Sequence, residues 1–262
     1  MNIIITGSRG FIGGHLMKNL KADKHKIVEW DLKIDKDIRD FNTKIRWATD
    51  KVDFVIHLAA FADVRRSIEH PDEYWVNNVE YTTNIQRLCH EQNIPLLYAS
   101  SSCIHQWHKS PYGISKKVNE ETAIGYNQIG LRFTTVYGEG ARESMFMGKL
   151  MRGDLPYATT HVRDFVHVDD VIRAIRLIMN QFSEHPRWAL HKRPRAYDIG
   201  TGVGHVVKDL AHLVNAEIPV QDGFPCEAQD NTADTAEIRN IGWLPSINAK
   251  NYLEQFIDGR TI

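Results

Sequence analysis

The chain begins with a short apolar strand that runs directly into a turn with three glycines, in the sequence MNIIITGSRGFIGGHL. Residues 2–6 predict a buried β-strand, and residues 11–22 predict a helix. A turn this tight needs backbone conformations that only glycine adopts at low cost, here at Gly7 and Gly10. Without side chains there, a pyrophosphate can approach the N–H groups at the helix start, where the helix dipole favours negative charge. Gly13 would let the helix pack close to the strand.

Two further features favour a dinucleotide-binding turn over a plain glycine turn. A second strand, within 26–32, carries Asp31 about 20 residues after the glycines, where an acidic residue binds the ribose hydroxyls of the adenosine. A third apolar stretch, 52–60, ends in small residues that suit close passage of a cofactor. Strands that alternate with helices in this way predict a parallel sheet covered on both faces.

At this point the sequence resembles the extended short-chain dehydrogenase/reductase family, which includes nucleotide-sugar epimerases and dehydratases. The glycine spacing is G-x-x-G-x-x-G, and the resemblance runs nearly end to end, through TGSRGFIG (6–13), DIRD (37–40), HLAA (57–60) and the helix at 70–89. It implies a doubly wound α/β Rossmann core that binds NAD, with a small C-terminal substrate lobe, as in UDP-glucose 4-epimerase-like members. The positions that it implies for cofactor binding are Gly7, Gly10, Phe11, Ile12, Gly13, Asp31, Asp37, Ile38, Leu58, Ala59, Ala60, Asn77, Ser100, Tyr112 and Lys116.

A tyrosine and a lysine follow the next predicted strand. Residues 96–106 read as a core strand with a serine-rich end, and residues 110–121 as a helix on which Tyr112 and Lys116 share one face. A phenol titrates near 10, but a nearby ammonium and the positive nicotinamide ring lower its pKa. Tyr112 can then exchange a proton with a sugar hydroxyl near neutral pH. Such a pair alone is commonplace on helices, but after the serines and the glycine turn it resembles the catalytic dyad of the family.

Which serine completes the catalytic set depends on the register of the strand. In the family the catalytic residue lies four positions before the aromatic of a Val-Tyr pair, and here Ile104 and His105 occupy that pair, which selects Ser101. Because His105 replaces the aromatic residue, a shift by one to Ser102 stays open. Side chains alternate along a strand, so only one of the two serines can face the substrate.

The two residues after Ser101 differ between the dehydratases and the epimerases of the family, so they bear on which reaction this chain catalyses. Dehydratases carry an Asp-Glu pair where this chain has Ser102 and Cys103, so we disfavour water elimination. The SSCI sequence resembles GDP-fucose synthases, whose cysteine is an acid or base in epimerisation. Their partner histidine would fall within 139–149, which contains none, so we favour Cys103 as a small hydrophobic residue.

The second half of the chain carries the expected substrate side. Residues 130–140 read as one core strand, with Thr135 where the family has a substrate-contacting asparagine. The stretch 162–179 resembles the Arg-Asp-Phe-x-x-Val-x-Asp element of the family, which implies that Arg163 pairs with the diphosphate of a nucleotide sugar; a planar guanidinium is well suited to this. The second phosphate-binding arginine of the family is missing, because 220–231 contains no Arg or Lys, so we expect an open or reduced nucleotide pocket. The predicted substrate-binding residues are Ser102, Cys103, Thr135 and Arg163.

The predicted reaction is NAD-dependent oxidation of a sugar hydroxyl to a ketone, which then receives the hydride on its other face, so that the sugar is epimerised. One alternative is an NADP-dependent epimerase-reductase of the GDP-fucose synthase type; Arg9 could meet a 2′-phosphate there, but Asp31 should repel one. Another is a catalytically silent dinucleotide-binding regulator, against which Tyr112 and Lys116 argue. The predicted NAD-binding core is 1–137 with 162–202, and the predicted substrate lobe is 138–161 with 203–262.

Composition limits the partners and the location. A net charge of −1 and the lack of a basic stripe argue against nucleic acid, and the most basic stretch, 187–195, reads as a surface loop. No apolar run reaches the ~18 residues of a membrane span, and a strand that begins at Asn2 leaves no room for a signal peptide. Three irregularly spaced cysteines predict neither disulfides nor a metal site. We therefore expect a cytoplasmic protein. The helices at 74–91 and 111–128 carry apolar residues beyond those that the sheet needs, and the resemblance to the family implies that they pair across a two-fold axis in a homodimer.

Overall fold

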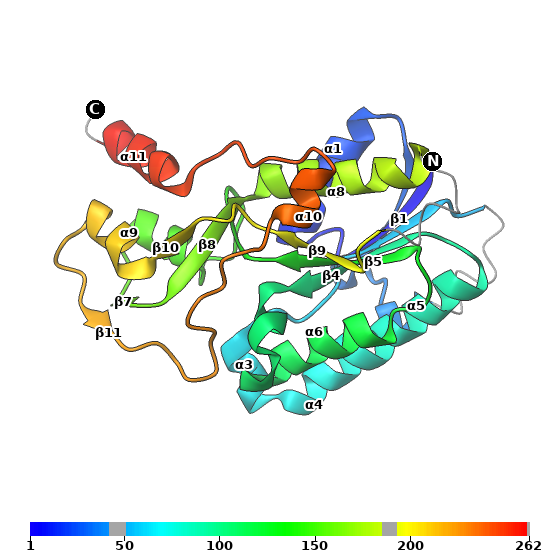
Figure 1. Cartoon of the computed structure of the whole chain (residues 1–262), viewed down its shortest axis with the longest axis horizontal. Coiled ribbons are helices and arrows are strands. Elements are labelled where there is room, and N and C mark those ends of the chain that lie inside the picture. The colour runs from blue at the N-terminus through cyan, green and yellow to red at the C-terminus, as the bar shows by residue number, and fades with distance from the viewer. Residues whose placement is uncertain (42–50, 185–192, 261–262) are drawn as a thin grey trace.

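The central sheet of the protein is parallel, as the sequence predicts. The structure is a computed structural model that describes residues 1–41, 51–184 and 193–260. Within these residues six strands run in the order β2-β1-β3-β4-β5-β9, all parallel (Figure 1). The order reverses beside β1, and the crevice at such a reversal is where α/β proteins bind ligands. The strands are β1 (Asn2–Thr6), β2 (Lys26–Trp30), β3 (Phe54–His57), β4 (Leu96–Ser101), β5 (Gln128–Phe133) and β9 (Ala196–Ile199).

Helices cover both faces of this sheet. Successive side chains of a strand point to opposite faces, so the apolar strands present apolar side chains on both sides. In β1, Ile3 and Ile5 pack with apolar residues of α1 and α8, whereas Ile4 packs with those of α5. Figure 1 shows α1 and α8 above the sheet and α5 and α6 below it. The doubly wound α/β fold is thereby confirmed. These helices are α1 (Phe11–Ala22), α5 (Tyr81–Glu91), α6 (Pro111–Thr122) and α8 (Val168–Glu184).

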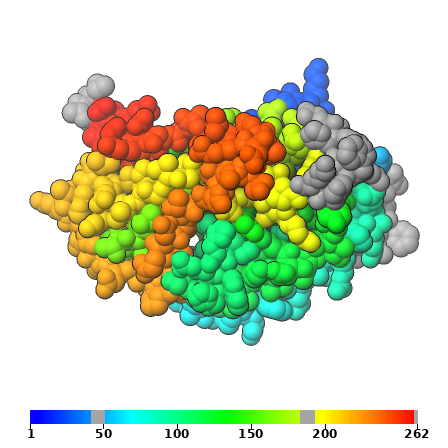
Figure 2. Space-filling view, viewed as in Figure 1, coloured from blue at the N-terminus to red at the C-terminus, as the bar shows by residue number. Residues whose placement is uncertain are grey.

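A smaller lobe with its own apolar core lies beside the carboxyl end of the sheet. Its strands form the mixed order β10-β8-β6 and the pair β11-β7, packed around Tyr137, Phe165, Leu210 and Leu253. Figures 1 and 2 show that the chain after β11, in orange, crosses back to the green helical layer of the core. The elements are β6 (Thr135–Tyr137), β7 (Ala158–Thr159), β8 (Val162–His167), β10 (Gly204–Val206), β11 (Val220–Gln221), α7 (Phe146–Arg152), α9 (Val207–Val214) and α11 (Ala249–Arg260).

Short helices complete the described chain. They are the 3₁₀ helices Leu32–Ile34, Ile38–Asp40 and Ser102–Lys109, the π-helix Trp75–Glu80, and the α-helices α3 (Val64–Glu69), α4 (Pro71–Tyr74) and α10 (Ala236–Asn240).

The prediction of a single strand at 130–140 is wrong in one respect, because the structure divides this stretch into β5 and β6, which belong to two different sheets. The chain bends at Thr134, whose backbone N–H and hydroxyl both donate to the carbonyl of Ile199, each at 3.2 Å. The bend carries Thr135 from the core sheet into the small lobe. The division is therefore the point at which the chain leaves the Rossmann sheet.

Three expectations concern features outside this core. Among the described residues no helix is long and apolar enough to cross a membrane. In the same residues no group of three or more His, Cys, Asp or Glu side chains is arranged to hold a metal ion. Most of the basic stretch at 187–195 falls within 185–192, outside the described residues.

Candidate active site

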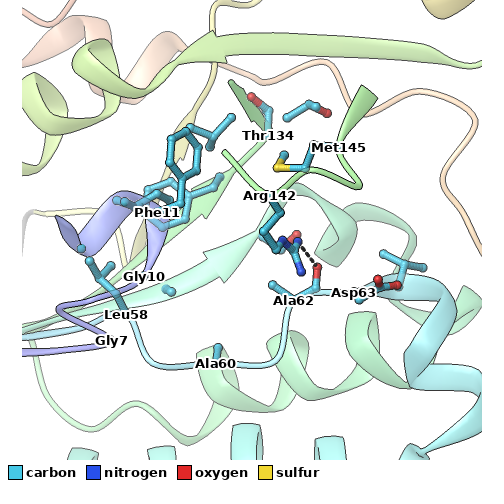
Figure 3. Close-up of a pocket in the computed structure, with 18 of the residues that line it drawn as sticks. Gly7, Gly10, Phe11, Leu58, Ala60, Ala62, Asp63, Thr134, Arg142 and Met145 are labelled. Carbon is cyan, nitrogen blue, oxygen red and sulfur yellow. Dashed lines mark hydrogen bonds between the residues drawn. The ribbon is translucent and has the colours of Figure 1, made fainter. Parts of the chain in front are cut away.

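A cavity of about 1000 Å³ lies between the carboxyl end of the parallel sheet and the small lobe (Figure 3). Most of the predicted site lines this cavity: the glycine turn, the serine-rich end of β4, the start of α6 and part of the small lobe. The predicted residues that line it are Gly7, Gly10, Phe11, Ile12, Gly13, Leu58, Ala60, Ser100, Ser101, Ser102, Cys103, Tyr112, Lys116, Thr135 and Arg163.

The glycine turn is built so that side chains cannot occupy it. Gly7 has φ +68°, and a Cβ there would lie 2.7 Å from the backbone nitrogen of Ala59. At Gly13 a Cβ would lie 2.0 Å from the Gly7 carbonyl oxygen. Helix α1 begins here with no side-chain cap, so its first N–H groups, near Phe11, are left for a ligand. This cradle fits the pyrophosphate of a dinucleotide.

Asp31, the predicted ribose ligand, lies at the end of β2 and is outside the cavity lining. Its carboxylate accepts hydrogen bonds from the backbone N–H groups of Arg9, at 2.8 Å, and Lys33, at 2.9 Å. The Arg9 side chain, which lines the cavity, pairs with Glu29, with Nε 2.6 Å from Oε2. In this structure Asp31 thus fixes the glycine turn against β2, and its contact with ribose stays a prediction.

Four other predicted cofactor residues also lie outside the lining: Asp37, Ile38, Ala59 and Asn77. Asp37 pairs with Arg39, and this hydrogen bond lowers the pKa of the Asp37 carboxyl. Asn77 donates to the side chain of Asn78 at 2.9 Å. Asn78 is buried and holds both the N–H and the carbonyl of Phe61, each at 2.9 Å. Asn78, which the sequence reasoning passed over, is therefore the asparagine that shapes the loop after β3.

The predicted catalytic side chains converge at the cavity wall. Tyr112 and Lys116 are buried on α6, and the Lys116 ammonium lies 5.8 Å from the centre of the Tyr112 ring. A hydrogen bond between the side chains of Ser101 and Tyr112 favours the phenolate, and Ser101 Oγ also accepts from the N–H of Cys103 at 3.2 Å. Ser101, the first choice from sequence, is thus the serine that the structure brings to Tyr112.

The electrostatics of this pair differ from the simple expectation that Lys116 lowers the pKa of Tyr112. Burial raises the pKa of Tyr112, and it lowers the pKa of Lys116 to about 7. Both shifts have one cause, because an apolar environment disfavours the charged form of either group. Lys116 donates to the carbonyl of Ala99 at 2.8 Å, which fixes its position. The guanidinium of Arg142, across the cavity, works in the other direction and lowers the pKa of Tyr112.

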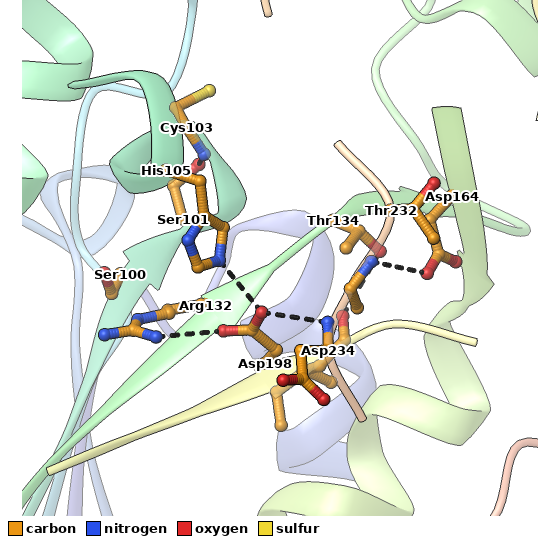
Figure 4. Close-up of polar contacts among 12 residues, drawn as sticks. Ser100, Ser101, Cys103, His105, Arg132, Thr134, Asp164, Asp198, Thr232 and Asp234 are labelled. Carbon is orange, nitrogen blue, oxygen red and sulfur yellow. Dashed lines mark hydrogen bonds and ion pairs between the residues drawn. The ribbon is translucent and has the colours of Figure 1, made fainter. Parts of the chain in front are cut away.

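A buried ionic network fixes the strand end that carries Ser101 (Figure 4). Arg132 pairs with Glu120 at 2.7 Å and with Asp198 at 3.2 Å, which joins β5 to α6 and β9. His105 binds the other oxygen of Asp198 at 2.9 Å, and this hydrogen bond raises the pKa of His105. The hydroxyl of Ser100 donates to Glu120 at 2.5 Å, so Ser100 and Ser101 are held in different surroundings. The network was not foreseen from the sequence.

Charged side chains that the sequence reasoning missed also line the substrate side: Arg65, Arg142 and Glu227. Arg142 reaches across the cavity to the carbonyl of Ala62, at 3.4 Å (Figure 3). One signal was available for Arg65, because it follows the small residues at the carboxyl end of the third strand, where α/β proteins bind ligands.

The predicted substrate residues Thr135, Cys103 and Arg163 lie together on this side. Thr135 Oγ1 accepts from Asn231 at 3.2 Å. Burial raises the pKa of the Cys103 thiol. Arg163 is held by protein groups, with donations to the carbonyls of Val162 at 2.9 Å and Ala228 at 2.8 Å.

Comparison with known proteins gives consistent matches over the whole chain. The model of the family described as "NAD dependent epimerase/dehydratase family" matches residues 3–200. Protein CapI of Staphylococcus aureus is 32% identical over 327 aligned residues, which cover 98% of each chain. A putative UDP-glucose 4-epimerase of Methanocaldococcus jannaschii is 27% identical, with 98% of this chain and 97% of the relative covered. Since this chain has 262 residues, the 327-residue alignment with CapI means that the relative carries insertions.

Among solved structures, MoeE5 in complex with UDP-glucuronic acid and NAD superimposes with a TM-score of 0.82. It is 26% identical to this chain, and the match covers 100% of both chains.

Proposed function

The chain belongs to the NAD-dependent epimerase/dehydratase family, and from that premise we propose that it epimerises a nucleotide sugar through a ketone. The observation that carries this proposal is the convergence of Ser101, Tyr112 and Lys116 on the cavity that the glycine turn also lines. A silent dinucleotide-binding regulator would have no need of a buried, hydrogen-bonded tyrosine beside a buried lysine.

NAD fits the cofactor side. The bare amides at the start of α1 would hold its pyrophosphate, and Lys116 would contact its ribose, while Asp31 would bind the adenosine ribose. When bound, NAD accepts a hydride from the sugar carbon and returns it. Arg9 is paired with Glu29, a carboxylate that would compete with a 2′-phosphate for the guanidinium, which supports NAD over NADP.

The protein's own groups supply the proton chemistry. Tyr112 takes the proton of the sugar hydroxyl as the ketone forms and returns it afterwards, and Ser101 hydrogen-bonds the same oxygen. Burial in the ligand-free protein keeps the phenol protonated, whereas the hydrogen bond with Ser101 and the guanidinium of Arg142 favour the phenolate.

We favour epimerisation over dehydration because of the two residues that follow Ser101 at the end of β4. Ser102 and Cys103 stand where the dehydratases carry acidic residues, and the half-buried Cys103 thiol, with its raised pKa, is a poor base near neutral pH. Curated relatives with epimerase names, such as the putative UDP-glucose 4-epimerase, support this choice.

We further propose a cytoplasmic homodimer in which the core, predicted as 1–137 with 162–202, binds the cofactor, and the small lobe, predicted as 138–161 with 203–262, binds the sugar nucleotide. Strands β6 and β8, at the edges of the predicted core ranges, form one sheet with β10 and belong to the small lobe. Trp75 and Val76, at the start of the helix at 74–91, keep 46% and 36% of their surface exposed, which suits a two-fold interface. Light scattering at micromolar concentration should give twice the monomer mass, and a monomer would exclude this interface.

The function is tested with a panel of nucleotide sugars that carry different bases and sugars. The protein with NAD should convert one of them to an epimer, seen by NMR, with no net gain of absorbance at the reduced-nicotinamide band. Accumulation of reduced nicotinamide would indicate a net dehydrogenase, and loss of water from the sugar would indicate a dehydratase.

A further inference from the structure

Two arginines from opposite walls of the cavity meet at one carboxylate. Arg65, on α3 of the core, donates from Nε to Glu227 Oε1 at 2.7 Å. Arg163, on β8 of the small lobe, donates from Nη2 to Glu227 Oε2 at 3.2 Å. All three residues line the cavity. Glu227 therefore holds two guanidinium groups, whose residues lie far apart in sequence, within reach of a single small anion.

Acidic and basic groups alternate around this pair. The ammonium of Lys109 donates to the backbone carbonyl of Glu227 at 3.2 Å, and the carboxylates of Glu227 and Asp230 both act on Arg163 to raise its pKa against the effect of burial. A planar guanidinium suits the oxygens of a phosphate, so two guanidinium groups held close together suit an anion with two phosphates.

Arg65 is the arginine better able to bind that anion. Arg163 directs its terminal nitrogens at protein partners, which include the carbonyls of Val162 and Ala228, and its side chain is only 15% exposed. The Arg65 side chain is 48% exposed. A guanidinium has five N–H donors, and the two hydrogen bonds of Arg65 described here, to Glu227 and Tyr157, leave donors for a ligand.

Arg65 is held in place by the stretch 220–231, which contains no arginine. The Arg65 guanidinium carbon lies 3.9 Å from the centre of the Phe224 ring, and both Phe224 and Glu227 belong to the stretch 220–231. This stretch contains no Arg or Lys, and that is why the sequence predicted an open or reduced nucleotide pocket. Stacking and pairing fix the guanidinium before any ligand arrives, which lowers the entropic cost of binding.

We propose that Arg65 is the second diphosphate-binding cation of this site, and that with Arg163 it binds the nucleoside diphosphate part of the sugar nucleotide. The proposal rests on the proposed function, because it names the residues that recognise the substrate of that same cavity. It replaces the expected reduced pocket with a complete one, in which the second arginine comes from the core and not from the small lobe.

The test measures nucleotide binding by calorimetry, with NAD at saturating concentration so that the probes cannot occupy the cofactor site. UDP, CDP, GDP and ADP are compared with their monophosphates, for the wild type and for Arg65→Gln. The matched control is Arg66→Gln, because Arg66 is the adjacent arginine, pairs with Glu73 at 2.8 Å and lies outside the cavity lining.

Loss of a charge-assisted hydrogen bond from Arg65 should weaken the tightest-binding diphosphate about 10- to 100-fold and its monophosphate much less. Arg66→Gln should bind within about twofold of the wild type, and Arg65→Lys, which keeps the charge, should fall between wild type and Arg65→Gln. Thermal melting and NAD titration confirm that each variant is folded.

The experiment distinguishes a failure of the role proposed for Arg65 from a failure of the proposed function. A wild type that binds a diphosphate, together with an Arg65→Gln variant that binds it equally well, overturns the role of Arg65 and leaves the proposed function standing. A wild type that binds none of the four diphosphates overturns both. A loss of affinity that is equal for monophosphate and diphosphate also refutes the proposal, because it indicates a general effect of Arg65 on the cavity.

Discussion

Replacement of Lys116, the predicted catalytic lysine, should make the folded protein more stable. Lys116 is almost fully buried, and burial lowers its pKa from 10.5 to about 7. Below pH 7 the folded protein must keep a buried charge that the unfolded chain leaves in water. Lys116→Met removes that charge and keeps an unbranched side chain of similar length, so the cost of charge burial disappears.

The size of the effect follows from the pKa. A fall from 10.5 to about 7 corresponds to a penalty of about 5 kcal/mol below pH 7. Loss of the hydrogen bond to the Ala99 carbonyl gives back about 1–3 kcal/mol, so the variant should be about 2–4 kcal/mol more stable at pH 6. Between pH 7 and 10.5 the unfolded chain binds the extra proton, so the wild type gains stability as pH rises. At pH 9 the two proteins should unfold with nearly equal free energies.

Urea unfolding of nucleotide-free protein at pH 6 and pH 9 measures both free energies. Buried His57 has a pKa of about 3, lowered first by burial and then by Lys116, so it stays neutral in the wild type throughout this range. Lys117→Met is the matched control, because Lys117 is exposed and pairs with Glu121, and should change stability by less than about 1 kcal/mol. A variant that is less stable than the wild type at pH 6, or a difference that does not vary with pH, would refute the reasoning.

Three other substitutions test the site. Ser101→Ala should lower turnover about 10- to 100-fold and Ser102→Ala less than about threefold; the reverse order in steady-state kinetics would move the register by one. Gly13→Ala should destabilise the protein by about 1–3 kcal/mol and weaken NAD binding, because its Cβ would lie 2.0 Å from the Gly7 carbonyl. Gly14→Ala, whose Cβ would meet nothing within 4 Å, is the control in the same melting and titration experiments. NAD should bind at least about tenfold tighter than NADP, and Asp31→Ala should narrow that gap; equal affinities in the wild type would contradict the role of Asp31.

The parts of the fold that follow from local sequence were predictable. The helix at 11–22 has the predicted bounds, because glycines and an apolar stripe define it within one short stretch. Tyr112 and Lys116 share a helical face for a reason that needs no tertiary information. The division of 130–140 into two strands was missed, because it depends on the hydrogen bonds from Thr134 to a strand that comes much later in the chain.

The polar parts of the site depend on contacts between distant residues and left little local signal. Arg65 and Glu227 are 162 positions apart, and His105 and Asp198 are 93 apart. Neither pair shows a pattern in the sequence, since any of the other carboxylates in the chain could have served as the partner. The shifted pKa of Lys116 likewise comes from burial by the whole fold, which the spacing of the dyad does not reveal.

The central claim is that Tyr112 exchanges the proton of the sugar hydroxyl, and turnover of Tyr112→Phe tests it most directly. The variant keeps the ring and its packing and loses only the phenolic oxygen. With the nucleotide sugar that the wild type converts, epimerisation measured by NMR should fall by about 10²–10⁴ or more, while NAD binding and the melting temperature stay near those of the wild type. If the folded variant epimerises the sugar at the wild-type rate, Tyr112 is not the catalytic group and the proposed mechanism is wrong.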